Sequence, residues 1–330
     1  MKKIIVSSIF IAAIASMSLI AACQGKYSGP SQSISIGITV SAANVVFFTA
    51  ESQHYFANNG INLTLDTYST GPSAITDLVN GKIDIAYTSE YPVVTGAFAN
   101  DNISIVTNIS TSYVTNLVAL TSSGISNIAD LKGKNIGVPF GTISQFYFGQ
   151  FLELNGMSIS DVTLVNLPVA QDVTALGNGS VDAVVTRDPY ESQIDNQYPD
   201  GTVTWSVQSS QALNDVLVCR NDWIQQNPAL LQRFLDALKQ SENYIISHPT
   251  EAKAILQQNY TSSNEYVNSE WSDYQFALSL NESLIAAMEN EARWTISNNL
   301  TTSTQVPNFL NYIYTGGLKV IEPDSVNIIQ

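Results

Sequence analysis

Short apolar runs alternate with longer amphipathic stretches along most of this chain. Apolar runs of strand length lie at residues 36–38, 61–68, 136–138 and 162–167. Between them, residues 45–59 and 142–155 carry apolar and aromatic side chains at helical spacing. A regular alternation of strands and helices is typical of α/β proteins with largely parallel sheets. We therefore predict an α/β fold whose strands are flanked by helices.

Two segments of the chain repeat one another at an offset of 98 positions. Residues 80–92 and residues 178–190 both begin with Asn-Gly, which suits the end of a helix because glycine accepts the left-handed backbone conformation. In both copies a short apolar run follows, and polar residues come directly after it. The runs at 36–38 and 136–138 are likewise followed by helical segments that end at Asn-Gly. A duplicated unit of this kind predicts two lobes with a cleft between them.

The last third of the chain is predicted to be mainly helical. Residues 228–247 have apolar side chains at helical spacing, and Pro228 suits the first turn of a helix. His248 and Pro249 mark the end of this helix and the start of the next one. Further amphipathic stretches lie at residues 249–258, 263–280 and 282–298, and a strand-like run lies at 318–321.

The N-terminus has the order of features found in an export signal. Two lysines precede an uncharged apolar stretch at residues 4–20, and Cys23 follows small residues. This arrangement resembles a bacterial or archaeal lipobox, which implies cleavage before Cys23 and attachment of lipid to its thiol. A transmembrane helix is the alternative, although about 20 apolar residues are needed to span a bilayer. We predict a lipoprotein signal peptide at residues 1–22, followed by a linker at residues 23–33.

The chain is acidic, with 13 basic and 28 acidic residues and a net charge of −15. A surface of this sign repels nucleic acid and anionic lipid headgroups, so binding to either is not expected. The overall charge does not restrict the ligand, because a pocket can be locally positive. Cysteine occurs only twice. With Cys23 lipidated, Cys219 has no partner, and we expect no disulfide.

Six stretches carry a family resemblance. They are residues 50–61, 78–84, 128–138, 175–183, 222–252 and 306–326. In this order and spacing, over nearly all of residues 34–328, they resemble the nitrate/sulfonate/taurine group of type II periplasmic binding proteins, which also includes thiamine-precursor binders. The resemblance implies the two-lobed fold of that group. Each lobe would be a mainly parallel sheet flanked by helices, with extra C-terminal helices.

The same resemblance implies that the chain crosses between the lobes twice. We place the crossings near residues 111–117 and 207–214. Lobe one would then comprise residues 34–112 and 213–330, and lobe two would comprise residues 116–207.

The function that the resemblance implies is that of a solute-binding lipoprotein of an ABC importer. Such a protein holds a small molecule between its lobes and delivers it to a membrane permease that works with an ATPase. We expect it outside the cytoplasm, in the periplasm or at the cell surface, anchored to the cell membrane by its lipid. We expect a monomer without a cofactor. A surface sensor that partners a receptor would use the same clamp and stays an alternative.

Small polar residues follow the strands in both halves of the chain. In open α/β sheets, ligands bind at these strand ends, where helix N-termini offer unpaired backbone N–H groups and a partial positive charge. The alternative role of the Ser and Thr residues is helix capping alone. The candidate ligand-binding residues are Asn44, Thr70, Gly71, Thr88, Ser89, Glu90, Thr142, Ser144, Arg187 and Asp215. The aromatic residues that could wall an apolar part of the ligand are Phe47, Tyr87, Tyr91 and Tyr147.

Arg187 is the sharpest single candidate, because basic residues are few and a guanidinium can grip a carboxylate or sulfonate with two hydrogen bonds. Its alternative is a structural ion pair with Asp188 or Glu191. Glu90 could bind a ligand amine or ring nitrogen, or it could stabilise the start of a helix. We expect a small organic anion such as a sulfonate or taurine, or a nitrate-like ion. A thiamine pyrimidine precursor is the alternative ligand.

The sequence does not suggest an active site. His54 and His248 are the only histidines, and neither lies in a pattern typical of a catalytic triad or a metal site. The chain has no nucleotide-binding glycine fingerprint and no HExxH motif. A thiamine-pyrimidine synthase shares the family's fold, but it carries a cysteine cluster that is absent from this sequence. We therefore expect a binding protein that is not an enzyme and holds no metal.

Overall fold

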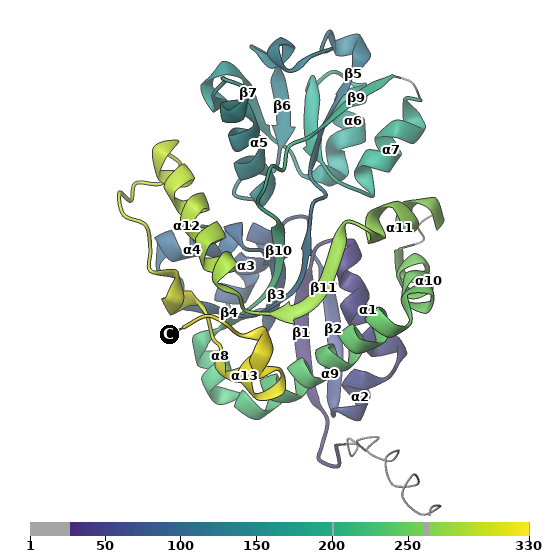
Figure 1. Ribbon diagram of the computed structural model, residues 1–330, viewed down its shortest axis with the longest axis vertical. Coiled ribbons are helices and arrows are strands. Elements are labelled where there is room, and N and C mark those ends of the chain that lie inside the picture. The colour runs from purple at the N-terminus through teal and green to yellow at the C-terminus, as the bar shows by residue number, and fades with distance from the viewer. Residues whose placement is uncertain (1–26, 200, 261–263, 330) are drawn as a thin grey trace, which may run out of the picture.

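The computed structural model describes residues 27–199, 201–260 and 264–329, which form two lobes stacked along the long axis of the molecule (Figure 1). One lobe, called the large lobe below, is built on a six-stranded sheet, and the other, the small lobe, on a five-stranded sheet. Helices cover both sheets, so the predicted two-lobed α/β fold is confirmed. Within the described ranges, no helix is both long and apolar enough to cross a membrane.

The sheet of the large lobe has the strand order β11-β4-β10-β3-β1-β2. Its strands are β1 (Gln32–Ile38), β2 (Ile61–Thr67), β3 (Ile85–Ser89), β4 (Ile103–Ser112), β10 (Leu213–Arg220) and β11 (Tyr274–Ser279). The helices packed with it are α1 (Val45–Ser52), α2 (Tyr55–Asn58), α3 (Gly71–Val79), α4 (Tyr91–Ala99), α8 (Asn221–Gln226), α9 (Pro228–Ser247), α10 (Pro249–Tyr260), α11 (Asn264–Trp271) and α13 (Gly316–Ile321).

The sheet of the small lobe has the strand order β7-β6-β8-β5-β9. Its strands are β5 (Asn116–Leu120), β6 (Asn135–Val138), β7 (Thr163–Asn166), β8 (Ala183–Thr186) and β9 (Thr202–Ser206). Its helices are α5 (Ile143–Leu154), α6 (Asp172–Gly177) and α7 (Tyr190–Gln197).

Both sheets are mixed, whereas the sequence predicted mainly parallel ones. The parallel pairs join the strands of the duplicated unit, β1 with β2 and β3, and β6 with β7 and β8. The antiparallel pairs involve β4, β5, β9 and β10, which lead into or out of the two connections between the lobes. The direction of these strands follows from the path between the lobes, which the local hydrophobic pattern does not encode.

Two short segments connect the lobes. Residues 113–115 join β4 to β5, and residues 207–212 join β9 to β10. Gln208 ties the two segments together: its Oε1 accepts hydrogen bonds from the backbone N–H groups of Val114 (2.6 Å) and Thr115 (2.7 Å). The paired segments therefore form one double connection.

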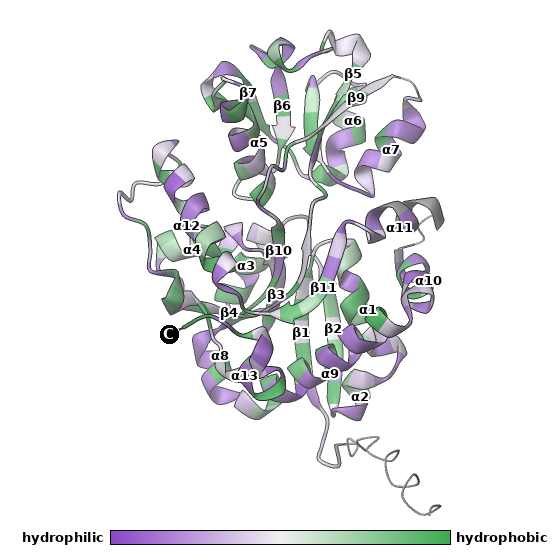
Figure 2. Cartoon of the chain, viewed as in Figure 1, coloured by the Kyte–Doolittle hydropathy of each residue, from purple (hydrophilic) through white to green (hydrophobic). Residues whose placement is uncertain are grey.

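The core of each lobe is apolar and closed. In Figure 2 the strands of both sheets are mostly coloured as hydrophobic, and the hydrophilic colour concentrates on the outer faces of the helices. Ile36 and Ile38 of β1 are buried in the large lobe, as are the equivalent Ile136 and Val138 of β6 in the small lobe. Equivalent strands of the duplicated unit thus bury equivalent side chains, which is why the repeat is visible in the sequence.

One helix, α12 (Glu282–Ser297), packs against both lobes. Leu284 and Met288 belong to the core of the large lobe, whereas Trp294 joins the core of the small lobe. The Trp294 ring lies 5.5 Å from the ring of Phe146 on α5, edge to face. Gly149 of α5 permits this approach, since a Cβ there would lie 2.1 Å from Cζ2 of Trp294.

Three predicted elements differ from the structure. The helix expected at 45–59 is broken between α1 and α2 by His54, whose left-handed φ of 59° ends the first segment. The stretch 263–280, expected to be helical, contains strand β11, because its second half adds to the open edge of β4. The run at 318–321, expected as a strand, lies in helix α13. Cys23, the predicted site of lipid attachment, lies outside the described residues.

Candidate ligand-binding site

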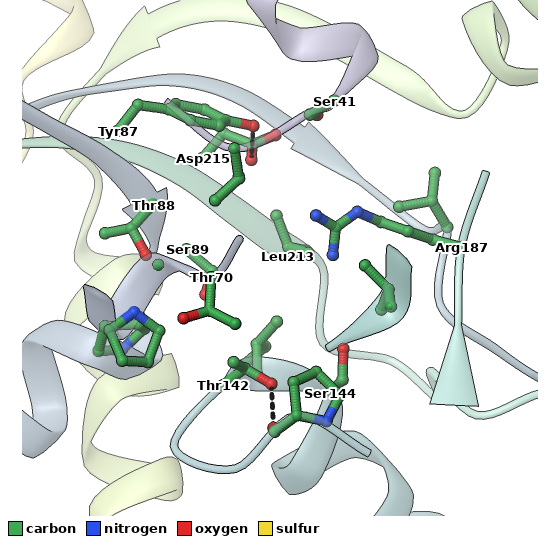
Figure 3. A pocket seen from close by; sticks show the side chains of 18 of the residues that line it. Ser41, Thr70, Tyr87, Thr88, Ser89, Thr142, Ser144, Arg187, Leu213 and Asp215 are labelled. Carbon is green, nitrogen blue, oxygen red and sulfur yellow. Dashed lines mark hydrogen bonds between the residues drawn. The ribbon is translucent and has the colours of Figure 1, made fainter. Parts of the chain in front are cut away.

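A cavity of about 50 Å³ lies between the two lobes. It is lined from the large lobe by Thr39, Ser41, Ser69, Thr70, Gly71, Pro72, Tyr87, Thr88, Ser89, Pro92, Leu213, Asp215 and Tyr274. The connection and the small lobe add Val114, Pro139, Thr142, Ile143, Ser144, Val169 and Arg187. Figure 3 shows polar side chains of both lobes directed toward one shared space. The arrangement suits a small ligand that touches both lobes at once.

On the large-lobe side, the cavity meets the start of α3. Thr70 caps this helix, accepting a hydrogen bond from the backbone N–H of Ser73 (3.4 Å), so the capping role considered from the sequence is real. Gly71 packs so closely that a Cβ there would lie 2.0 Å from Oγ1 of Thr88. That Thr88 hydroxyl is buried and has no hydrogen-bond partner among the described residues. It is therefore available to a ligand.

On the small-lobe side, the cavity meets the start of α5. The Thr142 hydroxyl donates to the carbonyl of Pro139 (2.7 Å), and Gln145 Oε1 accepts from the N–H of Gly141 (2.8 Å). Thr142 does not cap α5 with its side chain. Ile143 and Ser144, the first residues of the helix, line the cavity. The N-termini of α3 and α5, with their partial positive charge, thus both border the same space.

Arg187 follows β8 and points into the cavity (Figure 3). Its Nη2 donates a long hydrogen bond across the cleft to the carbonyl of Val40 (3.4 Å). The two carboxylates considered as ion-pair partners are engaged elsewhere: Asp188 accepts from the N–H of Ser192, and Glu191 from Asn116. No carboxylate in the described part of the chain lies within ion-pair distance of the guanidinium. Arg187 therefore presents an unpaired positive charge to the cavity.

Asp215 of β10 forms part of the floor of the cavity. Its carboxylate accepts hydrogen bonds from the Tyr87 hydroxyl (2.6 Å) and the Ser110 hydroxyl (2.7 Å). Burial raises the pKa of Asp215 to about 6, against the lowering effects of both hydrogen bonds and of the Arg187 charge. The site thus combines one free cation with one acid that titrates near neutral pH.

Two candidate residues lie outside this cavity. Asn44 is fully buried at the start of α1, and its Nδ2 donates to the carbonyl of Thr39 (2.6 Å) and to the Tyr260 hydroxyl. Glu90 is fully buried on the other side of the strand end, where Asn214 donates to both of its oxygens. Ser89 is the last residue of β3 and lines the cavity, whereas the next residue, Glu90, directs its carboxyl group to Asn214.

Several lining residues were not among the sequence candidates. Ser41 and Ser69 stand in loops that the strand-end rule does identify, so their position was accessible from sequence. Tyr274 was not, because it lies on β11, which the pattern predicted as helix. Of the aromatic residues considered, Tyr87 lines the cavity. Phe47, Tyr91 and Tyr147 are buried and do not line it.

Residues 42–252 match the model of a protein family described as "NMT1/THI5 like". A protein of Brucella abortus that is named as a binding protein is 24% identical over 210 residues, which cover 62% of this chain and 64% of that protein. The 4-amino-5-hydroxymethyl-2-methylpyrimidine phosphate synthase of Aspergillus parasiticus is 23% identical over 228 residues, with the same coverage of 62% and 64%. The matches span slightly less than two thirds of the length of these relatives.

Solved structures share the fold. The alkanesulfonate-binding protein of Xanthomonas axonopodis pv. citri, bound to MOPS, aligns with a TM-score of 0.73 and 18% identity over 88% of this chain and 100% of that one. The periplasmic aliphatic sulphonate-binding protein of Escherichia coli aligns with a TM-score of 0.70 and 18% identity over 86% and 92%. A desulfurization enzyme aligns with a TM-score of 0.66 and 15% identity over 88% and 98%. At these identities, binding proteins and an enzyme share one architecture, and only the site can separate them.

Proposed function

This chain belongs to the NMT1/THI5-like family, and on that premise we propose that it is a solute-binding protein that captures a small organic anion between its two lobes. It would deliver this ligand to the permease of an ABC importer, whose ATPase drives transport. A sulfonate is the leading ligand class, in keeping with the sulfonate-binding proteins that share the fold.

The observation that carries this proposal is the unpaired guanidinium of Arg187 in a cavity bordered by two helix N-termini. A partly buried charge without a partner is costly, and an anionic group of the ligand would supply that partner through charge-assisted hydrogen bonds. The free hydroxyl of Thr88, on the opposite lobe, could donate a further hydrogen bond to the same ligand.

Capture would work by closure of the lobes. We propose residues 113–115 and 207–212 as the hinge, with residues 34–112 and 213–330 moving against residues 116–207. A ligand that bridges Arg187 and the start of α3 stabilises the closed arrangement only, and it therefore shifts the equilibrium toward it.

A thermal-shift screen tests the ligand class. We expect methanesulfonate, ethanesulfonate or taurine to raise the melting temperature, since a ligand that binds only the folded state stabilises it. Arg187→Gln should abolish the shift, whereas Arg293→Gln, which removes an exposed arginine paired with Glu289, should keep it. Stabilisation by neutral or cationic compounds alone would contradict the proposal.

A thiamine pyrimidine precursor is the second candidate ligand. Relatives of this chain are pyrimidine phosphate synthases, and Asp215 could accept a hydrogen bond from an amino group. The apolar lining by Val114, Ile143 and Leu213 suits a ring. Including an aminopyrimidine in the same screen separates the two ligand classes.

We also propose that the mature protein begins at Cys23 and is held outside the cytoplasm by lipid on that thiol. Labelled fatty acid should be incorporated into the wild-type protein, and substitution of Cys23 by alanine should abolish this incorporation. Equal incorporation of fatty acid into Cys23→Ala and the wild type would contradict the anchor.

A further inference from the structure

Helix α12 joins the two lobes outside the ligand cavity. Trp294 of this helix is 3% exposed and packs in the apolar cluster of the small lobe. Its Nε1 donates a hydrogen bond to Glu153 Oε1 on α5 (3.1 Å), and its ring meets the ring of Phe146 edge to face at 5.5 Å. The contact between α12 and α5 is therefore both apolar and hydrogen-bonded.

The large lobe takes part in the same contact through α4. Tyr91, the first residue of α4, is buried and belongs to the apolar cluster of the small lobe. Its ring stacks against Phe146, with 6.2 Å between centroids, and its hydroxyl is hydrogen-bonded to the Thr295 hydroxyl of α12 (2.8 Å). Tyr91, Phe146 and Trp294 thus form one aromatic cluster between the lobes, which we call the aromatic bridge.

Helix α12 is also attached to the double connection. Gln211, in the segment 207–212, donates its Nε2 to Glu291 Oε1 (2.6 Å). Its Oε1 accepts a hydrogen bond from Asn290 Nδ2 (3.1 Å). Asn290 and Glu291 are consecutive residues of α12, so the helix that carries the aromatic bridge is fixed to the segment that connects the lobes.

The contacts across the ligand cavity are slighter than those of the aromatic bridge. Arg187 Nη2 reaches the carbonyl of Val40 over 3.4 Å, and a Cβ on Gly141 would lie in ordinary contact with Pro72, 3.6 Å from its Cγ. An aromatic side chain buries about 150–250 Å², and separation of α5 from α12 would expose such rings to water. Parting the lobes at the cavity therefore costs less than parting them at the bridge.

A wider hollow lies between the lobes on the side of α7 and α11. In Figure 1, α12 lies on one side of the double connection, and α7 and α11 lie on the other. The hollow has a volume of about 210 Å³, with Asp195 of the small lobe and Asp273 of the large lobe in its lining. Val114 of the connection borders both this acidic hollow and the ligand cavity. Like charges on the two lobes repel one another, which favours separation on this side.

We propose that the aromatic bridge is the pivot of the lobe movement, so that the cleft opens at the acidic hollow while α5 and α12 stay in contact. This inference rests on the closure of the lobes proposed above. A rotation leaves in place only the parts of a molecule that lie near its axis. Because the bridge and the double connection are both retained, the axis must pass along both. A ligand then enters between α7 and α11, past Val114.

Distances between pairs of spin labels, measured by pulsed electron paramagnetic resonance, test the pivot. One pair, Leu154→Cys with Arg293→Cys, spans the bridge from exposed positions of α5 and α12. The other pair, Asp195→Cys with Asp273→Cys, spans the hollow. In the ligand-free protein we expect one narrow distance for the bridge pair and a wider distribution, extending to longer distances, for the hollow pair. Taurine should shorten the hollow distance and leave the bridge distance unchanged.

Both labelled chains also carry Cys23→Ala, and the remaining thiol of Cys219 is buried. Trp294→Ala removes the ring at the centre of the bridge and should widen the distribution of the bridge pair. Trp223→Ala removes a buried tryptophan of the large lobe and should leave that distribution unchanged. If Trp294→Ala does not fold, Trp294→Phe takes its place in the same comparison.

A bridge distance that splits or lengthens in the ligand-free protein overturns the pivot, and so does a bridge distance that stays narrow in the Trp294 variant. Narrow distances for both pairs, unchanged by taurine, would mean that the lobes do not move, which overturns it too. A wide hollow distribution with a narrow bridge distance, in a protein that binds no sulfonate, would support the pivot and reject only the proposed ligand.

Discussion

Gly71 is the residue at which helix α3 comes closest to the neighbouring strand. In Gly71→Ala, the new Cβ would lie 2.0 Å from Thr88 Oγ1, so the helix start or the threonine must move. We expect a loss of about 1–3 kcal/mol in the free energy of unfolding, as for other overpacked sites. Ligand affinity should fall as well, because both residues line the cavity. Urea unfolding and ligand titration measure the two effects.

The control for this prediction is the double variant Gly71→Ala with Thr88→Ala, which removes the clashing hydroxyl. The nearest remaining Thr88 atom, Cβ, would lie 3.1 Å from the new methyl group. If the clash is the cause, the double variant is more stable than the sum of the single changes implies. Simple additivity would show that Gly71 matters for another reason.

Asp215 should make anion binding depend on pH. Its pKa of about 6 means that the carboxyl is charged above this pH and neutral below it. A negative charge on the cavity floor opposes an anion, so affinity should rise as the pH falls through about 6. Asp215→Asn should keep the high affinity at every pH. Isothermal titration calorimetry measures the affinity at each pH, and Asp222→Asn, at an exposed position, is the control. If the affinity of Asp215→Asn depends on pH as strongly as that of the wild type, Asp215 is not the cause.

At the residue scale, strand-to-helix junctions were predictable and side-chain directions were not. Thr70 and Thr142 could be placed from sequence, because each stands between an apolar run and a helical pattern. Glu90 also follows a strand, but its side chain turns toward Asn214 of β10, which lies 124 residues away in the chain and is brought beside it by the pairing of β10 with β3. The sequence could not establish that the Arg187 guanidinium has no ion-pair partner, since only the structure shows that Asp188 and Glu191 bind elsewhere.

At the scale of elements, the contact between α5 and α12 joins the two lobes. In Gly149→Ala, the added methyl group would overlap the Trp294 ring, with 2.1 Å to Cζ2. We expect destabilisation of about 1–3 kcal/mol and a change in tryptophan fluorescence, because Trp294 must leave its place beside Phe146. Leu154→Ala, at an exposed position of the same helix, should change neither. Unaltered fluorescence of Gly149→Ala would show that α12 tolerates a looser contact.

The elements that sequence predicted well are those whose own pattern decides their structure. Helix α9 has apolar positions at helical spacing over its whole length and ends before a proline, so its bounds Pro228–Ser247 match the prediction. Strand β11 is different, because it exists by pairing with β4 at the edge of the sheet. Strand propensity depends on such neighbours, and the sequence around Tyr274 does not reveal them.

At the scale of the whole molecule, the duplicated unit predicted two lobes but not how the chain joins them. Strands β4 and β10 run antiparallel to each other along their length and carry the chain between the lobes. No local signal fixes their direction, so the mixed character of both sheets was missed. The cavity nevertheless lies where equivalent strand ends of the two copies face each other. The duplication in the sequence was therefore enough to predict the place of the site.

The net charge of −15 should slow the capture of an anion. A second hollow between the lobes is lined by the acidic residues Asp188, Glu191, Asp195, Glu270 and Asp273. Added salt screens the net negative charge of the surface more than it screens Arg187 inside the cavity, since the Debye length falls to about 10 Å at 0.1 M salt. We therefore expect the association rate of a sulfonate to rise with ionic strength while its dissociation rate changes little. Stopped-flow fluorescence measures both rates, and an association rate that falls with salt would mean that local attraction by Arg187 outweighs the acidic surface.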